Sequence, residues 1–124
     1  MKLEGRYPYE AAVTAYGNGG FRFADMSHRG SILCLSSGVY AWDPVLAQDL
    51  RIEHFTRILS EMKAQSVLLL GTGVTQIFPD AALTRAFADA HIGLEAMSTG
   101  AAVRTYNILL GEKRAGGAAL IAVE

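Results

Sequence analysis

The first third of the chain shows a two-residue alternation of hydrophobic and polar positions, which predicts short strands. Phe21 and Phe23 stand on either side of a polar residue, as in a strand with one buried face. Residues 17–20, Gly-Asn-Gly-Gly, predict a hairpin turn because glycine and asparagine accept positive φ at little cost. Apolar runs interrupted by a Ser-Ser-Gly turn follow within residues 32–42. We therefore expect an antiparallel meander over residues 12–42.

After Pro44 the apolar residues recur at intervals of three and four, which predicts helices separated by strands. Pro79 suits the first turn of a helix, where its missing N–H would lack a partner anyway. Ser98 or Thr99 is a suitable N-cap for the last helix, and Gly111 is a natural stop. The expected elements are a helix over residues 55–62, a strand over 67–70, a helix over 79–90, a strand over 92–97, a helix up to 111 and a strand over 118–123.

This strand–helix–strand–helix–strand order predicts parallel neighbouring strands joined by right-handed crossovers. The runs 67–70 and 118–123 lack alternation, which is typical of strands covered on both faces. We therefore expect a compact α/β fold in which residues 1–124 form a single domain. The meander is expected either to extend the later mixed sheet or to cover it.

Composition and charge exclude several classes of protein. The chain has 124 residues and a formal net charge of -1, from 11 Lys and Arg against 12 Asp and Glu. Near-zero charge gives no electrostatic footprint for nucleic acid, and 51% hydrophobic residues exclude a disordered chain. No apolar run approaches the roughly 18 residues of a membrane span, and residues 1–6 lack the apolar segment of a secretory signal. Cys34 is the single cysteine and cannot form an internal disulfide, so we expect a cytoplasmic protein.

Gly71, Thr72 and Gly73 follow the strand over residues 67–70 and form the first candidate binding site. A glycine pair lets the backbone expose its N–H groups, which suits an anion. It also suggests a dinucleotide fingerprint, with Glu95 as the ribose ligand about 20 residues later. The third glycine position holds another residue and no helix opens there, which argues against that fingerprint. A plain tight turn and a backbone-lined pocket for a small ligand or a partner's side chain stay open.

Thr99, Gly100, Arg104 and Asn107 form the second candidate site. At 100° per residue the last three share a narrow arc of the helix. Gly100 lets another backbone approach, Arg104 offers a rigid fork of donors, and Asn107 offers donors and an acceptor. Loops at the carboxyl ends of parallel strands line the crevice where α/β domains bind ligands, so this segment and residues 71–73 are expected to face each other. Either they form a pocket with Arg104 as its charge, or Arg104 and Asn107 bond backbone carbonyls and tie down loops.

No other group of residues is marked out as a catalytic or metal site. The three histidines are isolated in sequence, without metal-ligand spacing. No pair of carboxylates is distinguished as an acid–base pair. Cys34 lies in an apolar run, which favours a buried inert thiol over a nucleophile. We therefore expect no metal, no cofactor and no catalytic residue, and whether the protein is an enzyme stays open.

Several segments of the chain resemble a known family of small domains. They are Tyr16-Gly17 with Gly20-Phe21, Gly30-Ser31, Trp42, residues 68–73, residues 93–97 and, above all, Thr99-Gly100-Ala101-Ala102 with Arg104-Thr105-Tyr106-Asn107. The family contains mitochondrial complex I assembly factor 3 and many bacterial and archaeal proteins. The resemblance covers nearly the whole chain and implies a three-layer β/β/α fold without established catalytic activity. The family block has cysteine where Val103 stands here, so no thiol chemistry is implied at that position.

The resemblance implies a non-catalytic binding or assembly-factor-like domain that recognises another protein, such as a subunit of a membrane or respiratory complex. One alternative is a small-anion or metabolite-binding domain, enzymatic or not, with a pocket formed by residues 71–73 and 99–104. Another alternative is a homo-oligomer in which the last helix packs against a copy of itself through Ala101 and Ile108.

Overall fold

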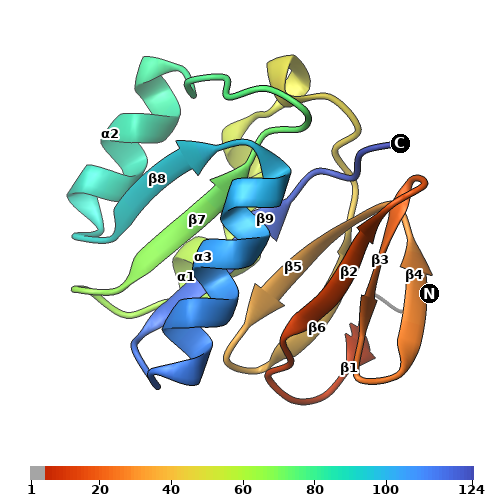
Figure 1. Ribbon diagram of the computed structural model, residues 1–124. Helices are drawn as coiled ribbons and strands as arrows, with labels where there is room; N and C mark the ends of the chain where they lie inside the picture. The colour runs from red at the N-terminus through yellow and green to blue at the C-terminus, as the bar shows by residue number, and fades with distance from the viewer. Residues whose placement is uncertain (1–4) are drawn as a thin grey trace.

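A six-stranded mixed sheet forms the middle layer of the molecule (Figure 1). The computed structural model describes residues 5–124; residues 1–4, on which the expected lack of a signal segment partly rests, lie outside the described residues. In spatial order the strands are β1 (Gly5–Tyr7), β6 (Gly38–Trp42), β5 (Ser31–Leu35), β9 (Gly116–Leu120), β7 (Val67–Gly71) and β8 (Gly93–Met97). β7 pairs in parallel with both β8 and β9, whereas β5 pairs antiparallel with β9. The predicted parallel part is therefore confirmed.

A second, antiparallel sheet consists of β2 (Val13–Gly17), β3 (Gly20–Phe23) and β4 (Met26–Arg29). The predicted hairpin joins β2 to β3, with Asn18 and Gly19 at φ 52° and 79°. A second hairpin joins β3 to β4 through Ala24 and Asp25, which also have positive φ. The expected meander thus divides: its first three strands cover the large sheet, while the β5–β6 hairpin extends it.

The helical elements are η1 (Ala47–Asp49), η2 (Ile52–Phe55), α1 (Thr56–Glu61), α2 (Ala81–Asp89) and α3 (Thr99–Gly111). α2 begins two residues after Pro79, because the side chain of Asp80 is its N-cap and accepts a hydrogen bond from the Leu83 N–H at 2.9 Å. Ser98 caps α3, as one of the two predicted alternatives. No helix within residues 5–124 is long and apolar enough to cross a membrane.

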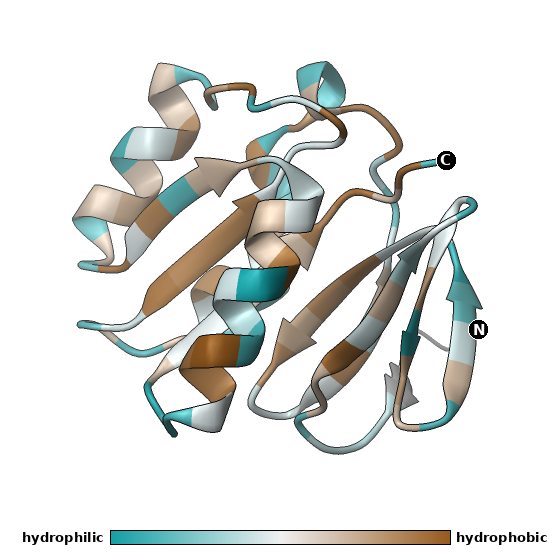
Figure 2. Cartoon of the chain, viewed as in Figure 1, coloured by the Kyte–Doolittle hydropathy of each residue, from teal (hydrophilic) through white to brown (hydrophobic). Residues whose placement is uncertain are grey.

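Both faces of the large sheet are covered, which gives three layers. Leu69 of β7 belongs to a buried cluster shared with α3 and the small sheet. Its neighbours Leu68 and Leu70 belong to a second cluster shared with η2, α1 and α2. Alternate residues of one strand thus pack into opposite layers, which explains why the run has no polar positions. Figure 2 shows the apolar strands enclosed between these layers, and the predicted α/β, three-layer β/β/α fold is confirmed.

Candidate functional site

The two predicted bends meet at the carboxyl ends of the parallel strands. The N–H of Thr99, the first residue of α3, donates to the carbonyl oxygen of Gly73 at 2.8 Å. In the reverse direction, the N–H of Gly73 donates to the hydroxyl oxygen of Thr99 at 3.0 Å. The loop after β7 and the start of α3 are therefore joined by a reciprocal pair of hydrogen bonds.

The hydroxyl of Thr99 also reaches the third parallel strand. It donates to the carbonyl oxygen of Ile121 at 2.7 Å, and the Thr99 side chain is completely buried. Gly71 makes this approach possible, since a Cβ there would stand 3.0 Å from the Thr99 Cα. The close contact, and not a special backbone angle, requires this glycine. The polar groups that the sequence offered to an anion are thus used to hold three strand ends together.

Thr72 braces the loop between β7 and α2, which we call the β7–α2 loop (residues 72–80). Its hydroxyl donates to the carbonyl oxygen of Thr75 at 2.7 Å and accepts from the N–H of Ile77 at 3.0 Å. The amide of Gln76 donates to the carbonyl oxygen of Ala96 on β8 at 2.7 Å. These bonds fix the loop to itself and to the edge strand.

The same loop presents apolar side chains to solvent. Val74 is 80% exposed, Phe78 is 77% exposed and Ile77 is 37% exposed. Figure 2 shows hydrophobic stretches in this connection above the ends of β7 and β8. The sequence prediction missed these residues, although the signal was present as hydrophobic residues in a segment assigned to neither a strand nor a helix.

Asn107 bonds the backbone of another element, which is the second of the two alternatives given above for this residue. Its Oδ1 accepts the N–H of Val13 at 2.9 Å, and its Nδ2 donates to the carbonyl oxygen of the same residue at 2.8 Å. The side-chain amide therefore pairs with β2 in the way that a neighbouring strand would. Asn107 therefore attaches α3 to the small sheet.

Arg104 differs from Asn107, because its guanidinium makes no hydrogen bond or ion pair with the rest of the described chain. It is exposed on α3, next to the ring of Tyr16 from β2. The hydroxyl of Tyr16 and Nη1 of Arg104 both approach the position that a Cβ of Gly100 would occupy, Nη1 at 3.6 Å. The sequence prediction did not place Tyr16 at this site, since no local pattern brings β2 next to α3.

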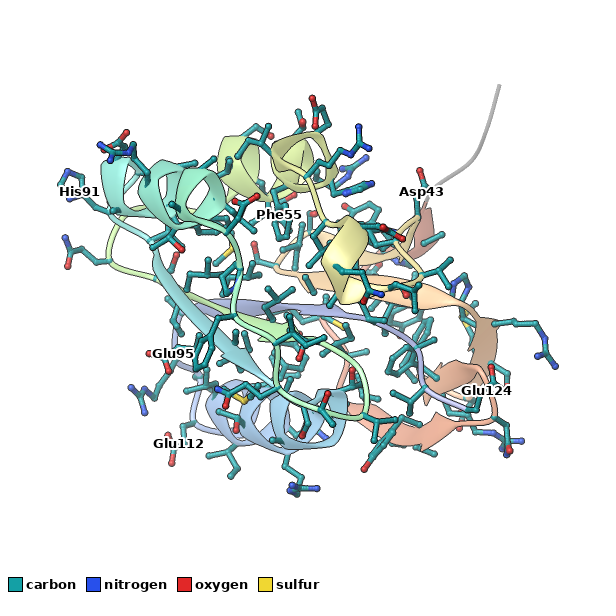
Figure 3. The ribbon with its side chains drawn as sticks, turned by 90° about the horizontal axis from the view of Figure 1, so that it is seen from above. Asp43, Phe55, His91, Glu95, Glu112 and Glu124 are labelled. Carbon is teal, nitrogen blue, oxygen red and sulfur yellow. The ribbon has the colours of Figure 1, made fainter. Side chains whose placement is uncertain are left out.

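The other residues considered from the sequence do not add a reactive group at the carboxyl ends of the parallel strands. Cys34 is fully buried, and burial raises the pKa of its thiol to about 12, so the inert alternative holds. Glu95 is exposed on the edge strand β8 and lies at the outer rim of the molecule in Figure 3, and α2 does not open directly after Gly73. Within residues 5–124, no group of three or more His, Cys, Asp or Glu side chains could hold a metal ion.

An open hollow of about 500 Å³ lies on the opposite face of the large sheet from Thr99. Trp42, Asp43, Glu53, His54 and Arg57 contribute to its lining. The indole N–H of Trp42 donates to the carbonyl oxygen of His54 at 2.8 Å, so the aromatic ring is held in the wall. This hollow shares no residue with the two predicted bends.

Comparison with known proteins relates this arrangement to a family. A family model described as "Protein of unknown function (DUF498/DUF598)" matches residues 13–121. The chain belongs to this family. No curated protein matches the chain.

Solved structures support membership of the DUF498/DUF598 family. A protein from Bartonella henselae described as an outer membrane protein is 48% identical, with a TM-score of 0.90 over 96% of this chain and 100% of that one. A protein from Rhodopseudomonas palustris is 36% identical, with a TM-score of 0.80 over 99% of this chain and 93% of that one. A Bordetella pertussis protein described as a Mth938-like domain is 29% identical, with a TM-score of 0.77 over 98% and 92% of the two chains.

Proposed function

We propose that this member of the DUF498/DUF598 family is a protein-binding domain whose contact surface is the β7–α2 loop. The observation that carries the proposal is the exposure of Val74 and Phe78 on a loop that is otherwise fixed by hydrogen bonds. Scattered exposed hydrophobic residues are common on protein surfaces, but several that gather in one short loop are typical of an interaction site.

The bracing of the loop favours binding. A flexible loop loses backbone conformational entropy when it docks, and this cost weakens binding. Here Thr72 and Gln76 already hold the backbone in place through the bonds to Thr75, Ile77 and β8. A partner therefore meets a preformed apolar surface.

A second exposed apolar segment supports the same end of the molecule as the contact surface. Val45 and Leu46, which lead into η1, are 77% and 49% exposed. Figures 1 and 3 show η1 and the β7–α2 loop at the same end, above the carboxyl ends of β7 and β8. A partner that covered both segments would bury more apolar surface than the loop alone offers.

The partner we propose is a subunit of a larger assembly, membrane-bound or respiratory. This part of the proposal is supported by the resemblance to the family that contains a respiratory assembly factor. The description of the Bartonella henselae relative as an outer membrane protein is compatible with a partner at a membrane.

The test is site-specific photo-crosslinking in the native cells. A photoreactive amino acid replaces Phe78 in one variant and Val74 in another. The matched control carries it at Thr84, an exposed position on α2. We expect a discrete adduct of the same mass from positions 74 and 78, absent from position 84 and reduced by Ile77→Ser in the same chain.

The partner in the adduct is then identified. It is purified without the crosslink and titrated with the unlabelled protein. Phe78→Ser is expected to weaken this binding about tenfold or more, as for the central apolar residue of an interface. Equal adducts from all three positions would contradict the proposal. An adduct with the mass of two copies of this chain would instead assign the loop to a homo-oligomer.

A further inference from the structure

A second feature lies beside the start of α3, where Tyr16 from β2 covers Gly100. A Cβ at residue 100 would collide with the Tyr16 hydroxyl and would stand 3.1 Å from its Cζ. Glycine is therefore what allows the phenol ring to lie against the helix. The contact sets the end of the Tyr16 side chain beside the guanidinium of Arg104.

Both polar groups at this contact have donor capacity left. The hydroxyl of Tyr16 and the guanidinium of Arg104 form no hydrogen bond with each other or with any residue in the described range. Arg104 carries a permanent positive charge and a planar set of N–H donors, and a phenol can donate its O–H. Two donors beside a patch of helix without side chains can both bond one carboxylate, and the bond from a charged guanidinium is the stronger kind.

Charged groups of both signs lie around Tyr16 and the adjoining part of the small sheet. Tyr16 also lines a hollow of about 460 Å³ to which Arg22 and Arg29 contribute. The carboxylate of Glu124 lies within 4 Å of the position of a Cβ at Gly19, where Arg29 Nη1 also lies, and Glu10 is close enough to α3 to affect Tyr106. Figure 3 shows Glu124 beside the small sheet, whereas Arg104 belongs to α3. The positive charge that stands next to the Tyr16 hydroxyl is that of Arg104, whose Nη1 lies 3.6 Å from the same Cβ position of Gly100.

We propose that Tyr16, Gly100 and Arg104 form a receptor for a carboxylate side chain of the protein partner. The inference rests on the proposed function and adds the chemistry of the partner: an acidic residue near an apolar segment. The two contact regions are adjacent, because Thr99 precedes Gly100 and is bonded to Gly73, which precedes the exposed Val74.

The probe is a capped tetraglutamate peptide, titrated into the isotope-labelled protein while NMR follows the backbone amides. We expect saturable shifts at Gly100 and at Tyr16, and none with capped tetraglutamine. Arg104→Gln is expected to weaken the binding about fivefold to tenfold, since a charged hydrogen bond is lost. Tyr16→Phe is expected to weaken it less, because only the phenol donor is removed. Arg85→Gln, on the exposed face of α2, is the matched control and leaves the affinity unchanged.

A second pair of variants tests the geometry. Gly100→Ala forces the end of Tyr16 away from the helix, whereas a Cβ at Gly111 of the same helix meets nothing within 4 Å. We expect Gly100→Ala to weaken peptide binding severalfold and Gly111→Ala to leave it unchanged, with both spectra still showing the native fold. Equal affinities in the two alanine variants would overturn the proposed receptor.

Other outcomes are equally decisive. Shifts that do not saturate, or that appear equally next to every arginine, would show general charge attraction and overturn the inference. Equal affinity for free glutarate would assign the site to a small dicarboxylate and not to a peptide. If the crosslink from position 78 survives Arg104→Gln unchanged while the peptide does not bind, the proposed function stands and this inference fails. Peptide binding at Gly100 without any crosslink from position 78 would keep the receptor and remove the docking loop.

Discussion

The contact between Asn107 and Val13 allows a quantitative test of how α3 holds the small sheet. Asn107→Ala removes one acceptor and one donor, which lie 2.9 Å and 2.8 Å from the backbone groups of Val13. Val13 is only 2% exposed, so water replaces these bonds incompletely. The two residues are far apart in the sequence, so no hydrogen bond of the same helix or strand replaces the bonds that are lost.

The expected magnitude follows from the two backbone groups left without partners. An unsatisfied buried group costs about 1–3 kcal/mol, and partial access of water lowers that figure. We therefore expect Asn107→Ala to reduce the free energy of unfolding by about 2–4 kcal/mol. With an m-value of about 1–2 kcal/mol/M, the urea midpoint falls by about 1–4 M. The fluorescence of Trp42, the only tryptophan, follows the transition because its ring is buried against Phe55.

Asn107→Asp separates the hydrogen bonds from the packing of the side chain. At neutral pH the carboxylate cannot donate to the carbonyl oxygen of Val13, whereas a protonated carboxyl can both donate and accept. The folded state therefore raises the pKa of the introduced carboxyl above its usual value of about 3.9. Stability relative to the parent is lost as pH rises through that raised pKa and is regained on acidification.

Asn18→Asp, in the exposed hairpin turn, is the control for the added charge and should show no such recovery. The attachment of α3 to β2 through Asn107 would be refuted if Asn107→Ala unfolded at the parent midpoint. It would also be refuted if the gap between parent and Asn107→Asp were the same at pH 4 and pH 7.

Four further predictions follow from burial and hydrogen bonding. Thr99→Val removes a buried hydroxyl that accepts one backbone bond and donates another, and should lower the free energy of unfolding by about 2–4 kcal/mol in urea titrations. Leu69→Ala, in a strand residue 2% exposed, should cost about 2–5 kcal/mol, and a smaller loss would contradict its place in the core. Arg104→Ala should leave the thermal midpoint nearly unchanged, since its guanidinium bonds no described residue. Burial raises the pKa of Cys34 from 9.0 to about 12, so the thiol of the unfolded chain loses its proton at lower pH than the thiol of the folded chain. The free energy of unfolding should therefore fall above pH 9 by up to about 1.4 kcal/mol per pH unit. Cys34→Ala should show a shallower dependence on pH in the same range.

The later part of the fold was predictable because its signals are local. Continuous apolar runs marked β7 and β9, and the three- and four-residue spacing marked the helices between them. β4 was missed because Ala24 and Asp25 form its turn with positive φ but without glycine, so the usual turn signal is absent. The division of the meander between two sheets was left open, since alternation predicts a strand but not its partner.

The meeting of the two bends was predicted from the sequence, whereas the contacts formed there were predicted only in part. The rule for carboxyl ends of parallel strands correctly brought Gly73 and Thr99 together. It could not reveal that the Thr99 hydroxyl would bond Ile121, because that contact depends on where β9 ends. Tyr16 was missed for the same reason: β2 approaches α3 only through packing of one sheet on the other.

The internal bonds at this edge also explain why the exposed residues are the better candidates for recognition. Thr99 and Asn107 bond the backbone of neighbouring elements, so a change at either residue disturbs bonds that hold the layers together. Phe78 and Arg104 have no such role, and a partner can contact them without any rearrangement. Changes at the first pair should therefore alter stability and binding together, whereas changes at the second pair should alter binding alone. A stable Phe78→Ser variant that lost its crosslinked partner would show this separation directly, and a Phe78→Ser variant that unfolded like Thr99→Val would contradict it.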